Sequence, residues 1–185
     1  MDVTIIAQRY AKALFDLAIE MERLEVVKKD IDLIQEVIKE NPEFRRLLHS
    51  PIIPPGKKNK VIAGVFKSKL NELTFRFLQL VTRKERAVHL DSICLAFIKQ
   101  YKTYHNIISI KLTTAAKLDE ESRTALIAML TDQTHKTIEL TEEIDSKLVG
   151  GFVLTMEDKK YDASIRNQLE KLSKTFDKNL YIKGF

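Results

Sequence analysis

The spacing of apolar residues changes once along this chain, near residue 106, and this change constrains the fold more than any other feature. Before it, apolar residues recur every three or four positions, which is helical spacing. After it, Ile108, Ile110 and Leu112 alternate with polar residues, which is strand spacing. We therefore predict an N-terminal all-α bundle of about six helices over residues 1–105 and a small C-terminal α+β domain over residues 106–185.

Prolines and capping residues divide the N-terminal segment into helices. Pro51, Pro54 and Pro55 place an extended turn between the third and fourth of them, because each proline restricts the residue before it. The short connections are typical of a compact bundle. The expected helices run from a Thr4 cap to about Met21, from Glu25 to Lys39, from Glu43 to Leu48, from Lys57 to Phe66, from Asn71 to Arg83 and from Val88 to about Tyr104.

The C-terminal segment predicts a strand through residues 108–112, a helix capped by Asp119, and a strand containing Ile138 and Leu140. Gly150 and Gly151 then open another strand that ends near Leu154. Glycines at a strand entrance supply backbone freedom at positive φ, or room for another segment to approach.

A charged hairpin tip at residues 157–160 and a capped helix complete this domain. Asp162 or Ser164 can accept a hydrogen bond from the first free N–H groups of that helix. Ile165, Leu169, Leu172 and Phe176 fall on one face of it. We expect this helix to pair with the glycine strand, in a unit of about the size at which a core becomes marginal.

The sequence offers no catalytic residue, no metal site and no cofactor motif. Gly56-Lys57 lacks the earlier glycine of a phosphate loop, and Gly150-Gly151 lacks the third glycine of a dinucleotide fingerprint. The four histidines do not pair at metal-ligand spacing. Cys94, the single cysteine, lies in an apolar helix and is expected to be a buried, inert thiol.

The sequence also gives no indication of a targeting signal. The longest apolar run covers residues 93–98, far short of the roughly 20 residues that span a bilayer. Acidic residues lie near the start, which argues against a secretory or transit peptide, so we expect a mature, non-secreted protein.

The net charge of +5 is unevenly distributed. Residues 44–105 carry thirteen Lys and Arg against three Asp and Glu, whereas residues 1–43 carry six against ten. Such a basic segment suits nucleic acid, an acidic protein or an anionic lipid surface, and charge alone does not choose among them. A basic helical nucleic-acid-binding protein is therefore one hypothesis, although the segment has no groove-reading motif and few aromatics beside its lysines.

The first helix has an apolar arc of roughly 240°, wider than the ~100° stripe that one-sided burial requires. A central bundle helix explains this arc without a partner. Alternatively, one edge packs into the bundle while the other, with Ile6, Tyr10 and Ala13, faces a groove. Tyr10 can keep its hydroxyl in water while its ring is buried, and the small Ala13 lets a partner helix approach. The segment 73–81 is similarly broad.

Motifs along the whole chain resemble the F-type ATP synthase delta subunit family, which includes the mitochondrial oligomycin-sensitivity-conferring protein. The segment 148–154 with Asp162-Ala163-Ser164 is similar to the C-terminal signature of that family, and Tyr10 to Phe15 to its first helix. The turn at residues 48–51 with Lys57, and Arg86 between helices, also match. Residues 114–118 depart from the pattern, because they lack the proline that the family often has before the leucine.

The resemblance implies a non-catalytic stator subunit without a cofactor. In that family the bundle binds the N-terminal segments of the alpha subunits of the catalytic head through its first and fifth helices, and the C-terminal domain joins the b subunits of the peripheral stalk. The expected protein is present in one copy, takes part in proton- or sodium-driven ATP synthesis, and is peripheral to the cytoplasmic side of a bacterial inner membrane.

It is expected to reach the membrane only through the complex and not to contact nucleic acid. Helical geometry and the family's choice of helices together predict a head-binding groove at Ile6, Tyr10, Ala13, Phe77 and Leu80.

Overall fold

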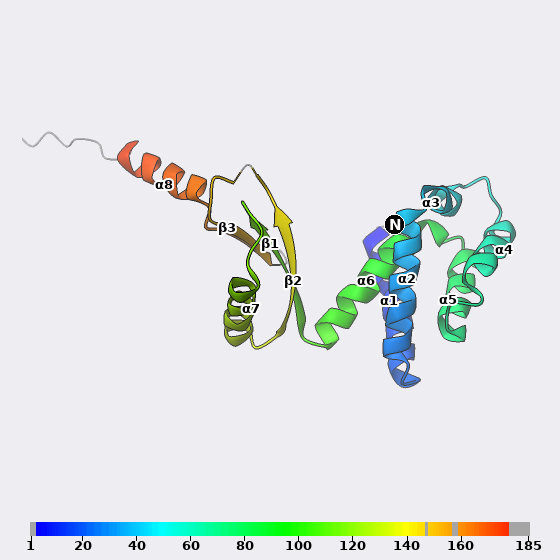
Figure 1. Ribbon diagram of the computed structural model, residues 1–185. Helices are drawn as coiled ribbons and strands as arrows, with labels where there is room; N and C mark the ends of the chain where they lie inside the picture. Colours follow the sequence, from blue (N-terminus) through cyan, green and yellow to red (C-terminus); the bar gives the residue numbers. More distant parts are fainter. Residues whose placement is uncertain (1–2, 147, 157–158, 178–185) are drawn as a thin grey trace, which may run out of the picture. The chain divides into compact units, whose positions relative to one another are not determined.

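The computed structural model describes residues 3–146, 148–156 and 159–177, with side chains described up to residue 174. The chain divides after Tyr104 into two compact units, 1–104 and 105–185. The predicted junction at residues 104–106 spans this division. The fold class is confirmed: a helical bundle is followed by a small α+β unit (Figure 1).

Six helices and one short 3₁₀ turn form the described part of the first unit. α1 packs chiefly on α6 and α5 on α4, and α2 contacts α1, α3, α5 and α6. Three alanines of α1 and the ring of Phe15, which meets Phe97 edge-on at 5.6 Å, lie in the α1–α6 interface region of the core. The elements are α1 (Val3–Glu20), α2 (Leu24–Glu40), α3 (Pro42–His49), α4 (Pro55–Phe66), α5 (Glu72–Arg83), the turn Ala87–His89 and α6 (Leu90–Tyr104).

The second unit has two layers, a four-stranded sheet and a covering helix. The strand order is β2-β1-β3-β4, with β1 parallel to β2 and antiparallel to β3. The register pairs Ile110 with Leu140 and Leu112 with Leu154. The elements are β1 (Ile107–Thr114), α7 (Glu120–Thr134), β2 (Thr137–Ile144), β3 (Phe152–Met156), β4 (Lys159–Asp162) and α8 (Ile165–Asp177).

The two faces of the sheet differ in polarity because the strands alternate as predicted. Ile108 and Ile110 face α7 and form a small core with Leu130. On the opposite face, Ser109 donates a hydrogen bond to Glu139 and Lys111 pairs with Glu143. The α7 connection between parallel β1 and β2 makes a βαβ unit, to which β3 and β4 add an antiparallel hairpin. Residues 157 and 158, half of the predicted hairpin tip, lie outside the described residues.

Two predicted helix caps have different outcomes. Asp119 is the N-cap of α7 and accepts a hydrogen bond from the Ser122 N–H at 3.1 Å, as predicted. Thr4 was expected to cap the first helix, and this is wrong, because α1 already includes Val3. An N-cap residue precedes the helix and has non-helical φ and ψ. Thr4 follows a helical residue, so it is not the cap.

α1 and α5 both end in a left-handed residue that is not glycine. Glu22 has a φ of 53° and Glu85 a φ of 57°. Around Glu22, the Arg23 N–H reaches the Ala18 carbonyl at 2.8 Å and the Glu22 N–H reaches the Ile19 carbonyl at 2.9 Å. This is the hydrogen-bond pattern of a Schellman motif, in which glycine is the preferred residue.

Replacing Glu22 with glycine should therefore raise the free energy of unfolding of the bundle by about 0.5–1 kcal/mol, because the left-handed conformation is strained for residues with a Cβ. Glu22→Ala is the control: it removes the same charge but keeps the Cβ. Denaturant unfolding of the three proteins separates the two effects. Equal stability of the glycine and alanine variants would contradict the prediction.

Candidate functional site

The first helix has two apolar edges, and the bundle covers one of them. Ala7, Ala11, Leu14, Phe15 and Ala18 are buried in the core. The other edge carries Leu17 and Met21, which remain 40% and 47% exposed. Of the two alternatives that the sequence left open, packing of one edge with the other edge exposed agrees with this geometry.

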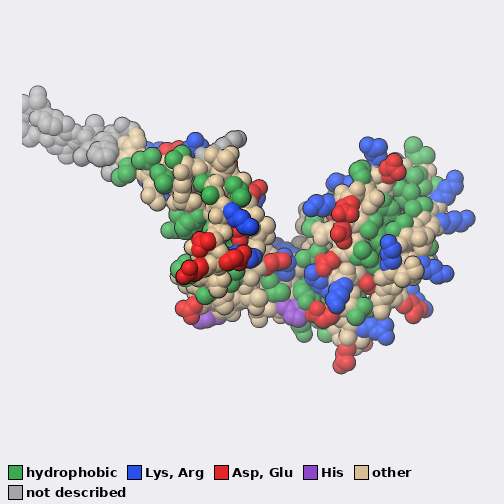
Figure 2. Space-filling view, viewed as in Figure 1, with side chains coloured by type: hydrophobic (Ala, Val, Ile, Leu, Met, Phe, Trp, Pro, Cys, Tyr) green, Lys and Arg blue, Asp and Glu red, His purple; other side chains and the backbone are tan. Residues whose placement is uncertain are grey.

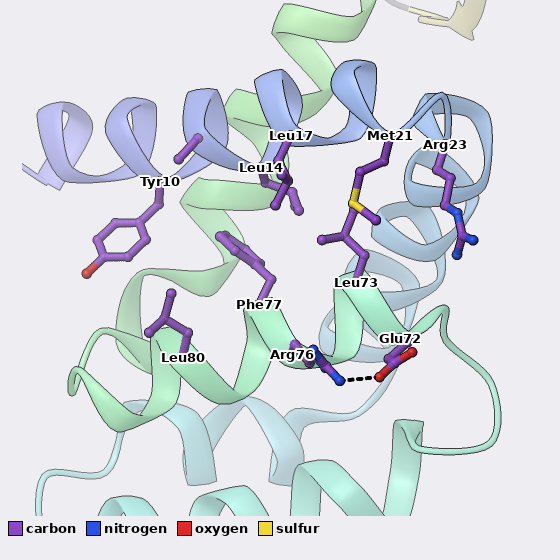
Figure 3. A pocket seen from close by; sticks show the side chains of 11 residues that line it. Tyr10, Leu14, Leu17, Met21, Arg23, Glu72, Leu73, Arg76, Phe77 and Leu80 are labelled. Carbon is purple, nitrogen blue, oxygen red and sulfur yellow. Dashed lines mark hydrogen bonds and ion pairs between the residues drawn. The ribbon is translucent and has the colours of Figure 1, made fainter.

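An open groove of about 600 Å³ lies between this second edge of α1 and α5 (Figure 3). We call it the α1–α5 groove. The rings of Tyr10 and Phe77 meet across it edge-on at 6.5 Å. Leu80, on α5, is 44% exposed. The groove is lined by Tyr10, Ala13, Leu14, Leu17, Met21, Arg23, Glu72, Leu73, Arg76, Phe77 and Leu80.

The two ends of the groove differ in charge. Figure 3 shows Tyr10 and Leu80 at one end and Arg23, Glu72 and Arg76 at the other. Arg76 and Glu72 form an ion pair one helical turn apart on α5. Both of these side chains are largely exposed, so the pair contributes little to stability. The groove therefore has an apolar body and a polar rim, which suits an amphipathic helix.

The structure brings together four of the five predicted groove residues: Tyr10, Ala13, Phe77 and Leu80 all line the groove. Ile6, the fifth, is half-buried on α1 and is not among the lining residues. Three further lining residues were not predicted as part of the groove: Leu17, Met21 and Leu73. Leu17 and Met21 follow Tyr10 and Ala13 along the same helical face, so the signal was present in the spacing.

The glycine pair brings the entrance of β3 close to the start of α8. Gly151 has a φ of +78°, and a Cβ at this position would lie 2.4 Å from the Ala163 carbonyl oxygen. The Gly150 carbonyl accepts a hydrogen bond from the Ile165 N–H at 3.0 Å. Gly151 thus has both properties proposed for the pair, a left-handed backbone and close approach of another segment.

Asp162 and Ser164 both form hydrogen bonds at the start of α8. Ser164 Oγ accepts from the Asn167 N–H at 3.2 Å, which is the N-cap interaction. Asp162 accepts from the Ser164 N–H at 3.0 Å. Hydrogen bonds from the Ser164 side chain and backbone hold the pKa of the Asp162 carboxyl below its usual range.

The apolar face of α8 is largely exposed. Ile165, Leu169 and Leu172 are 41%, 60% and 55% exposed, and Figure 2 shows hydrophobic side chains exposed on this helix. The physical reason lies in the sheet: α7 already covers the face with Ile108 and Ile110, and the other face is mostly polar, with Val153 as a buried exception. The Phe176 side chain lies outside the described residues. α8 therefore presents an apolar stripe that remains largely exposed among the described residues.

The chain is similar in sequence to a known protein family over most of its length. The family described as ATP synthase delta (OSCP) subunit matches residues 6–176. The chain belongs to this family. It is 34% identical over 176 residues to ATP synthase subunit delta of Cytophaga hutchinsonii, covering 95% of this chain and 96% of the relative. It is also 34% identical to the protein of the same name from Salinibacter ruber, covering 91% of this chain and 89% of the relative.

A solved structure has the same fold. A chain of the Toxoplasma gondii mitochondrial ATP synthase hexamer, determined by cryo-EM, superposes with a TM-score of 0.74. The match covers 92% of this chain and 96% of that chain at 22% identity. Membership of the delta (OSCP) family makes this protein a subunit of an ATP synthase.

Potential metal ligands are dispersed among the described residues of this delta-family chain, and its cysteine is buried. No group of three or more His, Cys, Asp or Glu side chains there is placed to hold a metal ion. Cys94 is fully buried, and burial raises the pKa of its thiol to about 12, so the nucleophilic thiolate is not formed near neutral pH. Across residues 3–146, 148–156 and 159–177, no helix is both long and apolar enough to cross a bilayer.

Part of the basic segment 44–105 is used within the bundle. Lys58 donates a hydrogen bond to the Leu48 carbonyl at 2.7 Å, and desolvation lowers the pKa of its ammonium group. This contact ties the start of α4 to the end of α3. Other Lys and Arg side chains gather along the edge of the bundle where α4 lies (Figure 2).

Gly151→Val should destabilise the α+β unit by roughly 3 kcal/mol, because it adds a left-handed strain of about 1–2 kcal/mol to a clash with the Ala163 backbone. Gly64→Ala is the control: a Cβ there meets nothing within 4 Å, so it should stabilise α4 by about 1 kcal/mol. NMR amide signals followed through thermal unfolding report each unit separately. The prediction fails if Gly151→Val leaves the signals of β3 and α8 unchanged.

Proposed function

We propose that this protein is a non-catalytic stator subunit of an F-type ATP synthase, in which the α1–α5 groove binds the N-terminal segment of an alpha subunit of the catalytic head. The α+β unit joins the b subunits of the peripheral stalk. The protein holds the head against the torque of the rotor during proton- or sodium-driven ATP synthesis. It is present in one copy on the cytoplasmic side of a bacterial inner membrane, which it reaches only through the complex.

The observation that carries this proposal is an open apolar groove on the bundle of a delta-family chain. An amphipathic helix places apolar residues on one face, with spacings of three and four positions, and these can enter the groove between Leu17, Met21 and Leu80. Each of these three side chains is already more than half buried, so covering the rest contributes about 1 kcal/mol apiece.

The burial of these three side chains sets the scale of the expected affinity for a peptide. About 3 kcal/mol from these three side chains, with a similar gain from the occupant, is offset in part by the lost freedom of the two molecules. We therefore expect a single helical peptide to bind weakly, nearer the millimolar than the micromolar range, since 1 mM corresponds to about −4 kcal/mol. A firm attachment in the complex then requires further contacts, since linked weak sites gain strength together.

The groove is tested with Ala13→Asp. Ala13 is exposed in the free protein, so the variant should fold normally, but occupation of the groove would bury the carboxylate without a partner. A synthetic peptide of the alpha-subunit N-terminus from the same organism should bind at least about tenfold more weakly, as measured by fluorescence anisotropy. NMR shifts in the wild type should centre on Tyr10, Ala13 and Leu80.

Gln8→Asp is the matched control for this test. It makes the same charge change on α1 at an exposed residue outside the groove lining, so affinity should stay close to that of the wild type. Shifts confined to the α+β unit, or equal affinity of the Ala13→Asp variant and the wild type, would refute the proposed head contact.

The stalk contact is proposed at the apolar stripe of α8. Ile165, Leu169 and Leu172 give it the spacing of a helix-binding face, and Arg166 and Lys171 beside them suit an acidic partner helix. A partner that covers the stripe would supply the burial that this unit lacks by itself.

Leu169→Glu should abolish binding to a soluble fragment of the b subunits without unfolding the free protein, because Leu169 is already mostly exposed. Lys174→Glu is the control, since it makes a larger charge change on the opposite side of α8. Co-purification and calorimetry give the affinities. If Leu169→Glu binds as well as Lys174→Glu, the stripe is not the stalk contact.

A further inference from the structure

One carboxylate of the bundle is buried. Asp30, on α2, is only 7% exposed. Its Oδ2 atom accepts hydrogen bonds from the Asn71 N–H at 2.9 Å and from the Thr74 hydroxyl at 2.6 Å. Thr74 is itself fully buried. Burial of a charged group is costly unless hydrogen bonds satisfy it, and here both donors come from the start of α5.

The position of this carboxylate at a helix N-terminus is electrostatically favourable. The first N–H groups of a helix have no partner within the helix and carry a partial positive charge. Asn71, the N-cap of α5, also accepts a hydrogen bond on its side chain from the Leu73 N–H at 3.1 Å. Asn71 is thus held by its side chain to α5 and by its backbone to α2.

This attachment links α2 to one wall of the groove. α1 packs chiefly on α6 and also contacts α2, whereas α5 packs on α4, α2 and the 87–89 turn. The ring contact between Tyr10 and Phe77 crosses the groove itself. α2 and the 87–89 turn therefore each contact both walls, and Asp30 is the residue through which α2 hydrogen-bonds to the start of α5.

We propose that Asp30 is a positioning residue for the α1–α5 groove. It fixes the first turn of α5 at the separation from α1 that an inserted helix requires. Asp30 does not line the groove, so its effect reaches the occupant through Leu73 and Phe77, which flank Thr74 on α5. This inference rests on the proposed function, because the occupant is taken to be the alpha-subunit N-terminal segment.

The test compares Asp30→Ala, Asp30→Asn and Thr74→Val at a temperature where circular dichroism shows every variant to be fully folded. Asp30→Ala and Thr74→Val should bind the alpha-subunit peptide about tenfold more weakly, because a displaced α5 changes the width of the groove. They should also weaken the nuclear Overhauser contacts between the Tyr10 and Phe77 rings in the free protein. Asp30→Asn should retain the peptide affinity and the ring contacts, since the oxygen of its amide can still accept hydrogen bonds from Asn71 and Thr74.

Ile38→Val is the control for a purely structural role. It trims the core about two turns further along α2 and should lower stability while leaving peptide affinity and the ring contacts unchanged. If folded Asp30→Ala and Thr74→Val keep wild-type affinity and ring contacts, the positioning role is wrong. A wild-type protein that fails to bind the peptide would refute the proposed head contact, and the ring contacts would then decide the role of Asp30 alone.

Discussion

The close packing of α1 on α6 is the interaction on which the rest of the bundle depends. Ala7, Ala11 and Ala18 are almost fully buried, and small side chains let two helices approach closely. With these residues turned to the core, Leu17 and Met21 fall on the opposite edge and remain partly in solvent. The groove is thus a consequence of how α1 meets α6.

The order of the elements and the fold class were predictable from the sequence, because apolar spacing, prolines and caps are local signals. Phe77 and Leu80, chosen by their spacing combined with the family's use of the fifth helix, both line the groove. Ile6 shows the limit of this reasoning. It shares a helical face with Tyr10, but whether it lines the groove depends on where α5 ends, which is a tertiary property.

α8 shows a second limit. An amphipathic pattern at Ile165, Leu169 and Leu172 predicts an apolar face correctly, but it does not reveal which surface covers that face. The sheet has one apolar side, and α7 occupies it. Asp30 was likewise visible in the sequence only as a polar residue among apolar ones, because its partners lie about forty residues away on α5.

The central position of β1 has a mechanical consequence. β1 pairs along its full length with β2 and along part of it with β3, and residues 105 and 106 connect it directly to α6. A force applied along this strand would load many hydrogen bonds at once in shear, whereas a force that peeled the short edge strand β4 would break its few bonds one after another. A subunit in the proposed stator role would gain most from a pull along β1, because the sheet resists force best in that direction.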